Sequence, residues 1–198
     1  MRRLLILSPA ALLLAACVHT AAVNPDPNHT HADFAVWLDG DRVDFSGDEF
    51  MSGLSDVEKE AEHPHVHLHE YLHLHDGNGN VVHRHKPGLT LTEFFTSIRI
   101  GFTDHCYTSG VPMEDGEFCS DNPWRLFVNG EERMPFSLDY AFTDLDRILI
   151  TTASDPAEVQ KELATMTDES CLYSKTCPER GEPPPESCIS DPAIPCKE

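Results

Sequence analysis

The histidines between residues 63 and 85 constrain this chain more than any other feature of its sequence. Eight of these 23 residues are histidine, and all eight have odd numbers. Side chains of a β-strand alternate between the two faces of a sheet. An extended segment 63–75 therefore carries imidazoles on one face and Val66, Leu68, Leu72 and Leu74 on the other. The pattern predicts an amphipathic strand whose apolar face meets a core.

A turn and a return strand follow. The run Asp76-Gly77-Asn78-Gly79-Asn80 is a strong turn signal, and residues 81–85 read as the second strand of a hairpin. With this loop, His73 lies opposite His83, and His85 opposite Tyr71. Opposed residues have Cβ atoms roughly 5 Å apart, and same-face neighbours along a strand lie roughly 7 Å apart. Several imidazoles can therefore converge on one metal ion.

The tightest predicted group comprises His73, His75, His83 and His85, with Asp76 as a carboxylate ligand or as a partner of a ligand. A first strand with Phe34, Val36 and Leu38 as its core face follows His29, and its His31 and Asp33 share the odd parity. The candidate metal residues are His73, His75, His83, His85, His67, His69, His65, His31, Asp76 and Asp33.

Imidazole ligands suit zinc, copper and nickel. We expect Zn²⁺ or Cu²⁺, with Ni²⁺ third, bound by a buffer, chaperone or sensor protein. A metal-dependent enzyme such as a hydrolase is an alternative, but no residue near the histidines is marked as its acid or base. A plain solvated face, a histidine-based pH sensor and a protein-interaction module are further interpretations.

The N-terminus indicates export. Arg2 and Arg3 precede an apolar run, residues 4–16, that is too short to span a bilayer as a helix. Leu14-Ala15-Ala16-Cys17 resembles the lipobox of bacterial lipoproteins, in which cleavage precedes the cysteine and the cysteine carries the lipid. That resemblance implies a membrane contact through the lipid alone. The expected location is the periplasmic or extracellular face of the envelope, at the outer membrane in a Gram-negative cell.

The net charge and the cysteine content limit the partners and the chemistry that this chain could have. The net charge of −20 argues against nucleic acid, which needs a basic surface. With Cys17 lipidated, six cysteines remain, and an even number in an exported chain indicates three disulfides. Pairing of neighbours is the default, and Cys106–Cys119 is its safest member. The other four cysteines are Cys171, Cys177, Cys188 and Cys196. A thiol redox enzyme is disfavoured because the chain has no C-x-x-C motif.

The order of elements predicts the fold. Over residues 66–152 it runs strand, turn, strand, helix, strand, short strand, strand. Thr90 and Glu93 form a capping box for the helix, which Gly101 should end. Residues 103–123 read as a loop, and a second helix opens at Asp155-Pro156. The order resembles the β-grasp (ubiquitin-like) fold. We expect an α+β protein: a β-grasp-like mixed sheet with one main helix, an extra N-terminal hairpin and a disulfide-stapled C-terminal tail.

The expected organisation is a signal peptide (1–16), a tether (17–30), a single domain (31–166) and a Cys/Pro-rich strap (167–198). The chain also resembles a family of poorly characterised, histidine-rich exported bacterial proteins that are sometimes labelled protein-disulfide isomerase. The resemblance rests on residues 31–34, 73–77, 83–85 and 168–180, and it covers about 30–190. It implies a shared fold and supplies no established activity.

Overall fold

The computed structural model describes residues 22–52, 69, 71–111 and 116–182. Its strands are β1 (Thr30–Leu38), β2 (Asp41–Arg42), β3 (Leu72–His73), β4 (Val81–Arg84), β5 (Ile100–Phe102), β6 (Cys106–Ser109), β7 (Gly116–Cys119), β8 (Arg125–Val128), β9 (Glu131–Arg133) and β10 (Arg147–Thr151). Its helices are α1 (Leu91–Ser97), α2 (Pro156–Thr165) and α3 (Ser170–Tyr173), with short 3-10 turns η1 (Asp48–Phe50) and η3 (Pro178–Arg180).

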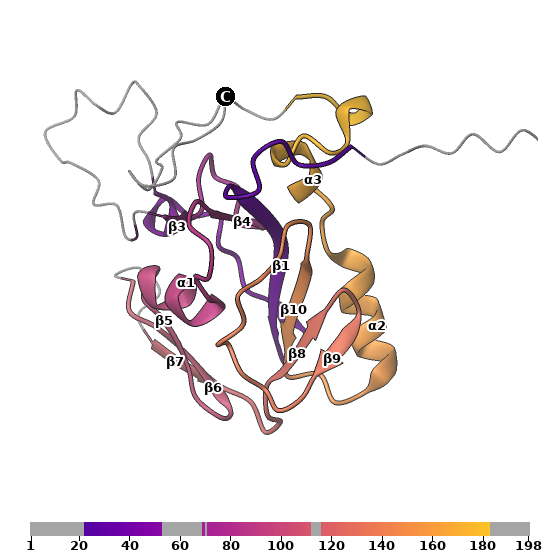
Figure 1. The fold of residues 1–198 in the computed structure, drawn as a ribbon. Helices are drawn as coiled ribbons and strands as arrows, with labels where there is room; N and C mark the ends of the chain where they lie inside the picture. The colour runs from indigo at the N-terminus through magenta and orange to yellow at the C-terminus, as the bar shows by residue number, and fades with distance from the viewer. Residues whose placement is uncertain (1–21, 53–68, 70, 112–115, 183–198) are drawn as a thin grey trace, which may run out of the picture.

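The main sheet is mixed. Its strands follow the order β3-β4-β1-β10-β8-β9, and β2 pairs with β1. β1 runs parallel to β10, with Phe34 beside Ile148 and Val36 beside Ile150, and the other neighbours in the sheet are antiparallel. β1 is buried along most of its length because it lies at the centre of the sheet with elements packed on both faces (Figure 1).

One face of the sheet carries the larger core. Phe34 and Val36 of β1, Leu72 of β3 and Val82 of β4 all belong to this core. α1 covers it, and the ring of Phe94 meets that of Phe34 at 5.3 Å, edge to face. The even-numbered apolar residues of these three strands thus face the core, as their alternation predicts.

α1 begins as predicted and ends early. The Thr90 side chain accepts a hydrogen bond from the Glu93 backbone, and the Glu93 side chain accepts one from the Thr90 backbone, so the capping box is confirmed. The predicted end at Gly101 is wrong. The helix stops at Ser97, Arg99 takes a left-handed φ of 62°, and Gly101 lies within β5.

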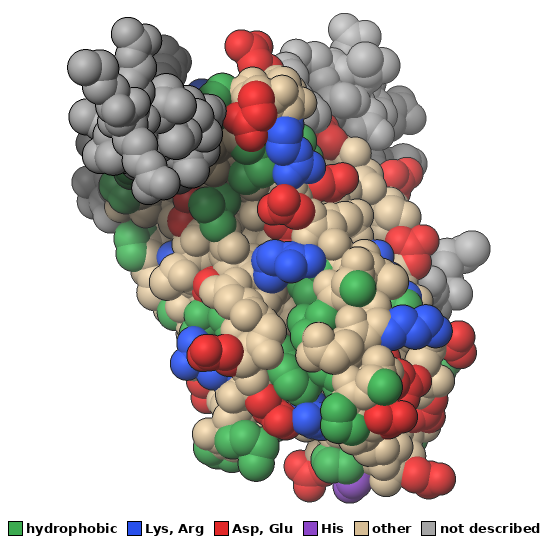
Figure 2. Space-filling view, turned by 90° about the vertical axis from the view of Figure 1, so that its right-hand side faces the viewer, with side chains coloured by type: hydrophobic (Ala, Val, Ile, Leu, Met, Phe, Trp, Pro, Cys, Tyr) green, Lys and Arg blue, Asp and Glu red, His purple; other side chains and the backbone are tan. Residues whose placement is uncertain are grey.

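The opposite face of the sheet carries a second, smaller core. Ala35, Phe127 and Leu149 of the sheet pack here with Val159 of α2. α2 begins with the Asp155 side chain accepting a hydrogen bond from the Ala157 backbone, and Pro156 takes the first helical turn. Figure 1 shows α1 and α2 on opposite sides of the main sheet. Figure 2 shows acidic side chains scattered over the α2 side and almost no histidine on it.

Residues 103–123, predicted as a loop, contain two strands of a second sheet. β5, β6 and β7 form an antiparallel sheet in which Cys106 lies directly opposite Cys119. These two cysteines form the predicted disulfide. The loop prediction was wrong because this segment has no clear alternation of apolar residues; backbone pairing across the cystine makes it a sheet.

The α+β class, the mixed sheet and the disulfide near the C-terminus are confirmed. The structure also shows where the N-terminal hairpin lies. Asp39 and Gly40 turn the chain with positive φ, and Val43 donates a backbone hydrogen bond to Val36. The long strand of this hairpin, β1, is the one that runs beside β10, and the β3–β4 hairpin extends the sheet from it.

The segment after α2 returns across β1. α3 packs on β1, and a second disulfide joins Cys171 to Cys177, as neighbour pairing predicts. Cys188 and Cys196 lie outside the described residues, as do Cys17 and the expected signal peptide. In Figure 1, α3 lies near the start of β1, away from α1.

Candidate metal centre

Imidazoles from three adjacent strands line up across the sheet. His83 of β4 pairs with His73 of β3 on one side and with His31 of β1 on the other. Residues paired across a sheet share a face, so these three side chains point away from the larger core. The same register sets His85, which follows β4, close to His29, which precedes β1, and their rings stack at 3.9 Å.

The predicted hairpin register is therefore present. His73 lies opposite His83, and the backbone N–H of His85 donates to the carbonyl of Tyr71. The sequence named His31 as a candidate but did not fix which strand would lie beside it. The pairing of β1 with β4 brings His31, and with it His29, to the imidazoles of the hairpin.

Three of the imidazoles lie close enough together that they could hold one metal ion. One ring nitrogen each from His29, His31 and His83 lie within 4.8 Å of one another. Nitrogens bound tetrahedrally to Zn²⁺ at about 2.0–2.1 Å would be about 3.4 Å apart. Where two of these nitrogens approach the 4.8 Å limit, their rings would have to move closer together to hold one ion. His29 was noted in the sequence only as leading into the first strand, and the pairing of β1 with β4 is what adds it to the group.

Other imidazoles surround this trio. The His75 ring lies 3.9 Å from that of His83, and the His73 ring lies 4.9 Å from that of His85. The His31 and His83 rings are themselves 4.8 Å apart. His83 is 0% exposed and His31 is 1% exposed. Adjacent buried imidazoles carry a high cost if they are charged, and the neutral ring is the form that binds metal ions.

A hydrogen-bond chain orients His31. The hydroxyl of Ser174 donates to Asp144 Oδ1 over 2.6 Å, because a carboxylate can only accept. The same Ser174 oxygen lies 2.7 Å from His31 Nδ1, so its remaining role is to accept, and Nδ1 carries the proton. The lone pair of His31 is then on Nε2. Such a chain, in which a ligand histidine donates its other N–H, is the usual companion of a metal-binding imidazole.

A second chain orients His83. His75 Nδ1 lies 2.7 Å from the carboxylate of Asp76 and donates to it, which puts the lone pair of His75 on Nε2. That Nε2 lies 3.1 Å from His83 Nδ1, so Nδ1 of His83 is the donor. His83 therefore has its lone pair on Nε2, as His31 does. The sequence predicts Asp76 as a ligand or as the partner of a ligand. In the structure Asp76 orients the ring of His75, and His75 in turn orients that of His83.

A tyrosine from the C-terminal segment covers the cluster. The Tyr173 ring lies 4.7 Å from the His83 ring, 5.6 Å from that of His31 and 5.8 Å from that of His75. The hydroxyl of Tyr173 accepts a hydrogen bond from the Asn78 amide, which belongs to the β3–β4 turn. The cluster is thus bounded by the sheet on one side and by α3 on the other.

The remaining candidates have different surroundings. Asp33 is fully buried, but both of its carboxylate oxygens accept hydrogen bonds from residues 167–170. The structure therefore gives Asp33 a role in holding the C-terminal segment. His69 accepts a hydrogen bond from the Tyr71 backbone. His65 and His67 lie outside the described residues.

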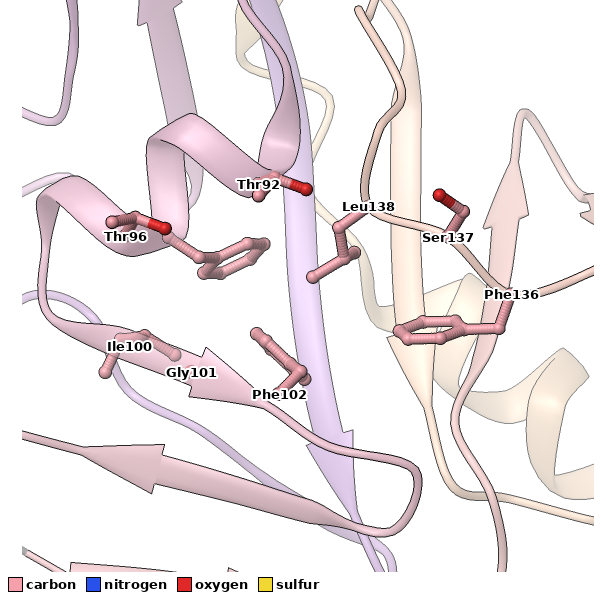
Figure 3. Close-up of a pocket in the computed structure, with 9 residues that line it drawn as sticks. Thr92, Thr96, Ile100, Gly101, Phe102, Phe136, Ser137 and Leu138 are labelled. Carbon is pink, nitrogen blue, oxygen red and sulfur yellow. The ribbon is translucent and has the colours of Figure 1, made fainter.

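Two other features of the described residues carry no comparable chemistry. Cys106, Cys119 and Glu117 lie close together, but the two sulfurs are joined in a disulfide. A cavity of about 360 Å³ lies between α1, β5 and residues 136–138. Figure 3 shows Thr92, Phe102 and Leu138 facing this space. Its lining has no ionisable side chain and none of the clustered histidines, so it provides no pocket beside the candidate metal centre.

Comparisons with other proteins identify no relative: no family model, curated protein or solved structure matches the chain. None of the helices within the described residues is long and apolar enough to cross a membrane. The fold and the cluster define an α+β protein with a buried group of histidines that could hold a metal ion.

Proposed function

We propose that this chain is a lipid-anchored metal-binding protein of the bacterial envelope, with His29, His31 and His83 as the ligands. The observation that carries the proposal is the convergence of these three imidazoles within 4.8 Å of one another. The hydrogen-bond chains that end at Asp144 and at Asp76 support it, because they orient the rings of His31 and His83 and put the lone pair of each on Nε2.

The ligand chemistry favours Zn²⁺ or Cu²⁺. Neutral imidazole suits both ions, and the four cysteines within the described residues are oxidised. The net charge of −20 raises the concentration of cations near the protein. Export and lipidation are inferred from residues 1–17, and they would place the centre outside the cytoplasm.

A binding role is favoured over catalysis. A catalytic metal needs an open coordination position and access for a substrate. Here His31 and His83 are buried beneath Tyr173, and the cavity of about 360 Å³ is lined by other residues. Such a centre fits a metal buffer, chaperone or sensor better than a hydrolase.

The test is elemental analysis of the full exported protein, purified without an affinity tag. We expect close to one zinc or copper ion per chain. His29→Ala and His83→Ala should each weaken binding by roughly 100-fold or more, since loss of a ligand costs more than loss of a ligand's partner. His105→Ala is the matched control, because His105 is exposed in the turn between β5 and β6.

The proposal fails if the wild-type protein takes up neither zinc nor copper at micromolar concentrations. It fails equally if His29→Ala and His83→Ala retain the wild-type affinity. Circular dichroism of each variant shows whether the fold persists, so loss of the site is separated from loss of the protein.

A further inference from the structure

The candidate metal centre is closed by a short segment of the chain. Residues 168–180, which we call the lid, comprise α3, η3 and the loop between them. The lid covers the cluster through Tyr173, whose ring packs on His83 and His31. Both of these histidines are almost fully buried, whereas His29 is half-buried, so the lid covers the more deeply placed part of the centre.

The lid also takes part in the centre. Ser174 supplies the oxygen that accepts from His31 Nδ1, and its hydroxyl donates a hydrogen bond to Asp144. Asn78 of the β3–β4 turn donates to Glu169 at the start of the lid and to Tyr173 within it. Displacement of the lid would therefore remove both the covering ring and the group that orients one ligand.

A disulfide holds the lid in its compact form. Cys171 lies in α3 and Cys177 lies at the start of η3, six positions apart, and their bond closes the loop that contains Tyr173 and Ser174. A cystine restricts the conformations of a displaced segment more than those of a docked one. The bond thus favours the closed lid. Asp33 accepts hydrogen bonds from the Glu169 and Ser170 backbone at the start of the lid, so the lid has an anchored end about which to open.

From this arrangement we infer that the Cys171–Cys177 disulfide is a redox lock on the metal centre. While the bond is intact, the lid stays closed and the ion exchanges slowly. Reduction of the bond loosens the lid, and the ion is released or acquired. The inference rests on the proposed function, and it specifies how that same site is regulated.

The co-reactant is a dithiol reductant. One of its thiolates attacks Cys177 Sγ, the Cys171–Cys177 bond breaks, and the electron pair remains on Cys171 Sγ. Arg180 Nη1 lies 3.3 Å from that sulfur, so its positive charge stabilises the thiolate that forms. The second thiol of the reductant then displaces Cys177. The reductant becomes a disulfide, and its two protons end on Cys171 and Cys177.

The other cystine provides a matched control. Cys106–Cys119 crosslinks two neighbouring strands of the small sheet, and its removal leaves the lid untouched. We would prepare the wild-type chain, Cys171→Ser/Cys177→Ser and Cys106→Ser/Cys119→Ser, each loaded with zinc. The readout is the rate at which zinc passes to an excess of a coloured chelator.

We expect the lid variant to release zinc about 10- to 100-fold faster than the wild type, the range that closure of a loop this short gives. The control variant should release zinc at the wild-type rate, and a dithiol should accelerate the wild type and the control but not the lid variant. Equal release from the lid variant and the wild type would overturn the lock while leaving the metal site intact. A wild-type chain that binds no zinc would overturn both.

Two further measurements keep the test decisive if the lid variant is poorly folded. Tyr173→Ala retains the cystine and removes the covering ring, so it should also speed zinc release. Hydrogen exchange of the metal-free protein reads the lid directly, because the Ser174 and Thr176 amides donate to carbonyls within it. These amides should exchange faster after dithiol treatment, and unchanged exchange would contradict the inference.

Discussion

At the scale of single residues, the role of a side chain here depends on what the fold places next to it. Asp33 and Asp76 are both acidic residues close in sequence to histidines. Asp33 is fully buried and accepts hydrogen bonds from Thr167, Glu169 and Ser170. Asp76 is exposed, and it orients His75. Asp33 therefore holds the C-terminal segment in place, whereas Asp76 orients an imidazole of the candidate metal centre.

Asp33→Asn should lower the free energy of unfolding by about 2–3 kcal/mol, because an amide cannot accept all three hydrogen bonds and loses the charge that strengthens them. Denaturant unfolding of the metal-free protein measures this. Asp41→Asn, at an exposed position of β2, is the control, and it should stay within about 0.5 kcal/mol of wild type. Equal effects at the two positions would show that Asp33 does not anchor the C-terminal segment.

At the scale of elements, the turn between β3 and β4 illustrates how two glycines of one motif differ. Gly77 has a left-handed φ of +68°, with nothing within 4 Å of the position a Cβ would take. A Cβ on Gly79 would clash with the backbone of Phe45. The first glycine is required by local conformation, and the second by a distant segment packed against the turn.

Gly79→Ala should therefore destabilise the protein by about 3 kcal/mol, since backbone must shift to admit the methyl group. Gly77→Ala should lower the free energy of unfolding by about 1 kcal/mol, because a residue with a Cβ is disfavoured in the left-handed conformation. Denaturant midpoints of the two variants give the comparison. A larger loss at Gly77 than at Gly79 would contradict the packing of the turn on Phe45.

At the scale of the whole molecule, stability depends on a buried acidic side chain of α2. Glu162 is 2% exposed, on a helix that packs against the sheet. Burial raises the pKa of Glu162 above its ordinary value of 4.5, and the negative charge of Glu158 raises this pKa further. The folded protein therefore binds the Glu162 proton more tightly than the unfolded chain does.

The pH dependence has a definite sign. The contribution of Glu162 to stability is fully present below pH 4.5 and is lost as pH rises through the raised pKa of the folded state. Glu162→Gln should remove this loss, so the variant should gain stability relative to wild type as pH rises from 4 to 7. Paired unfolding curves of the metal-free proteins test this, and a difference that stays constant with pH would contradict it.

Much of the candidate site was predictable from local pattern. Alternation in a strand is fixed by backbone geometry, so the odd parity of the histidines and the even parity of Leu72, Leu74 and Val82 determined which side chains would share a face. The turn at 76–80 then set His73 opposite His83. The capping box at Thr90 and Glu93 follows from backbone groups at a helix start, which depend only on neighbouring residues.

The tertiary structure decided which imidazoles meet. His29 and His31 are more than 50 residues from His83, and only the pairing of β1 with β4 joins them. Ser174, Asp144 and Tyr173 reach the cluster from segments still farther along the chain, and no local pattern marks them. The sequence determined a histidine face because that depends on neighbours two residues apart. The fold determined the candidate metal centre because its members meet only when β1 enters the middle of the sheet and the lid closes over it.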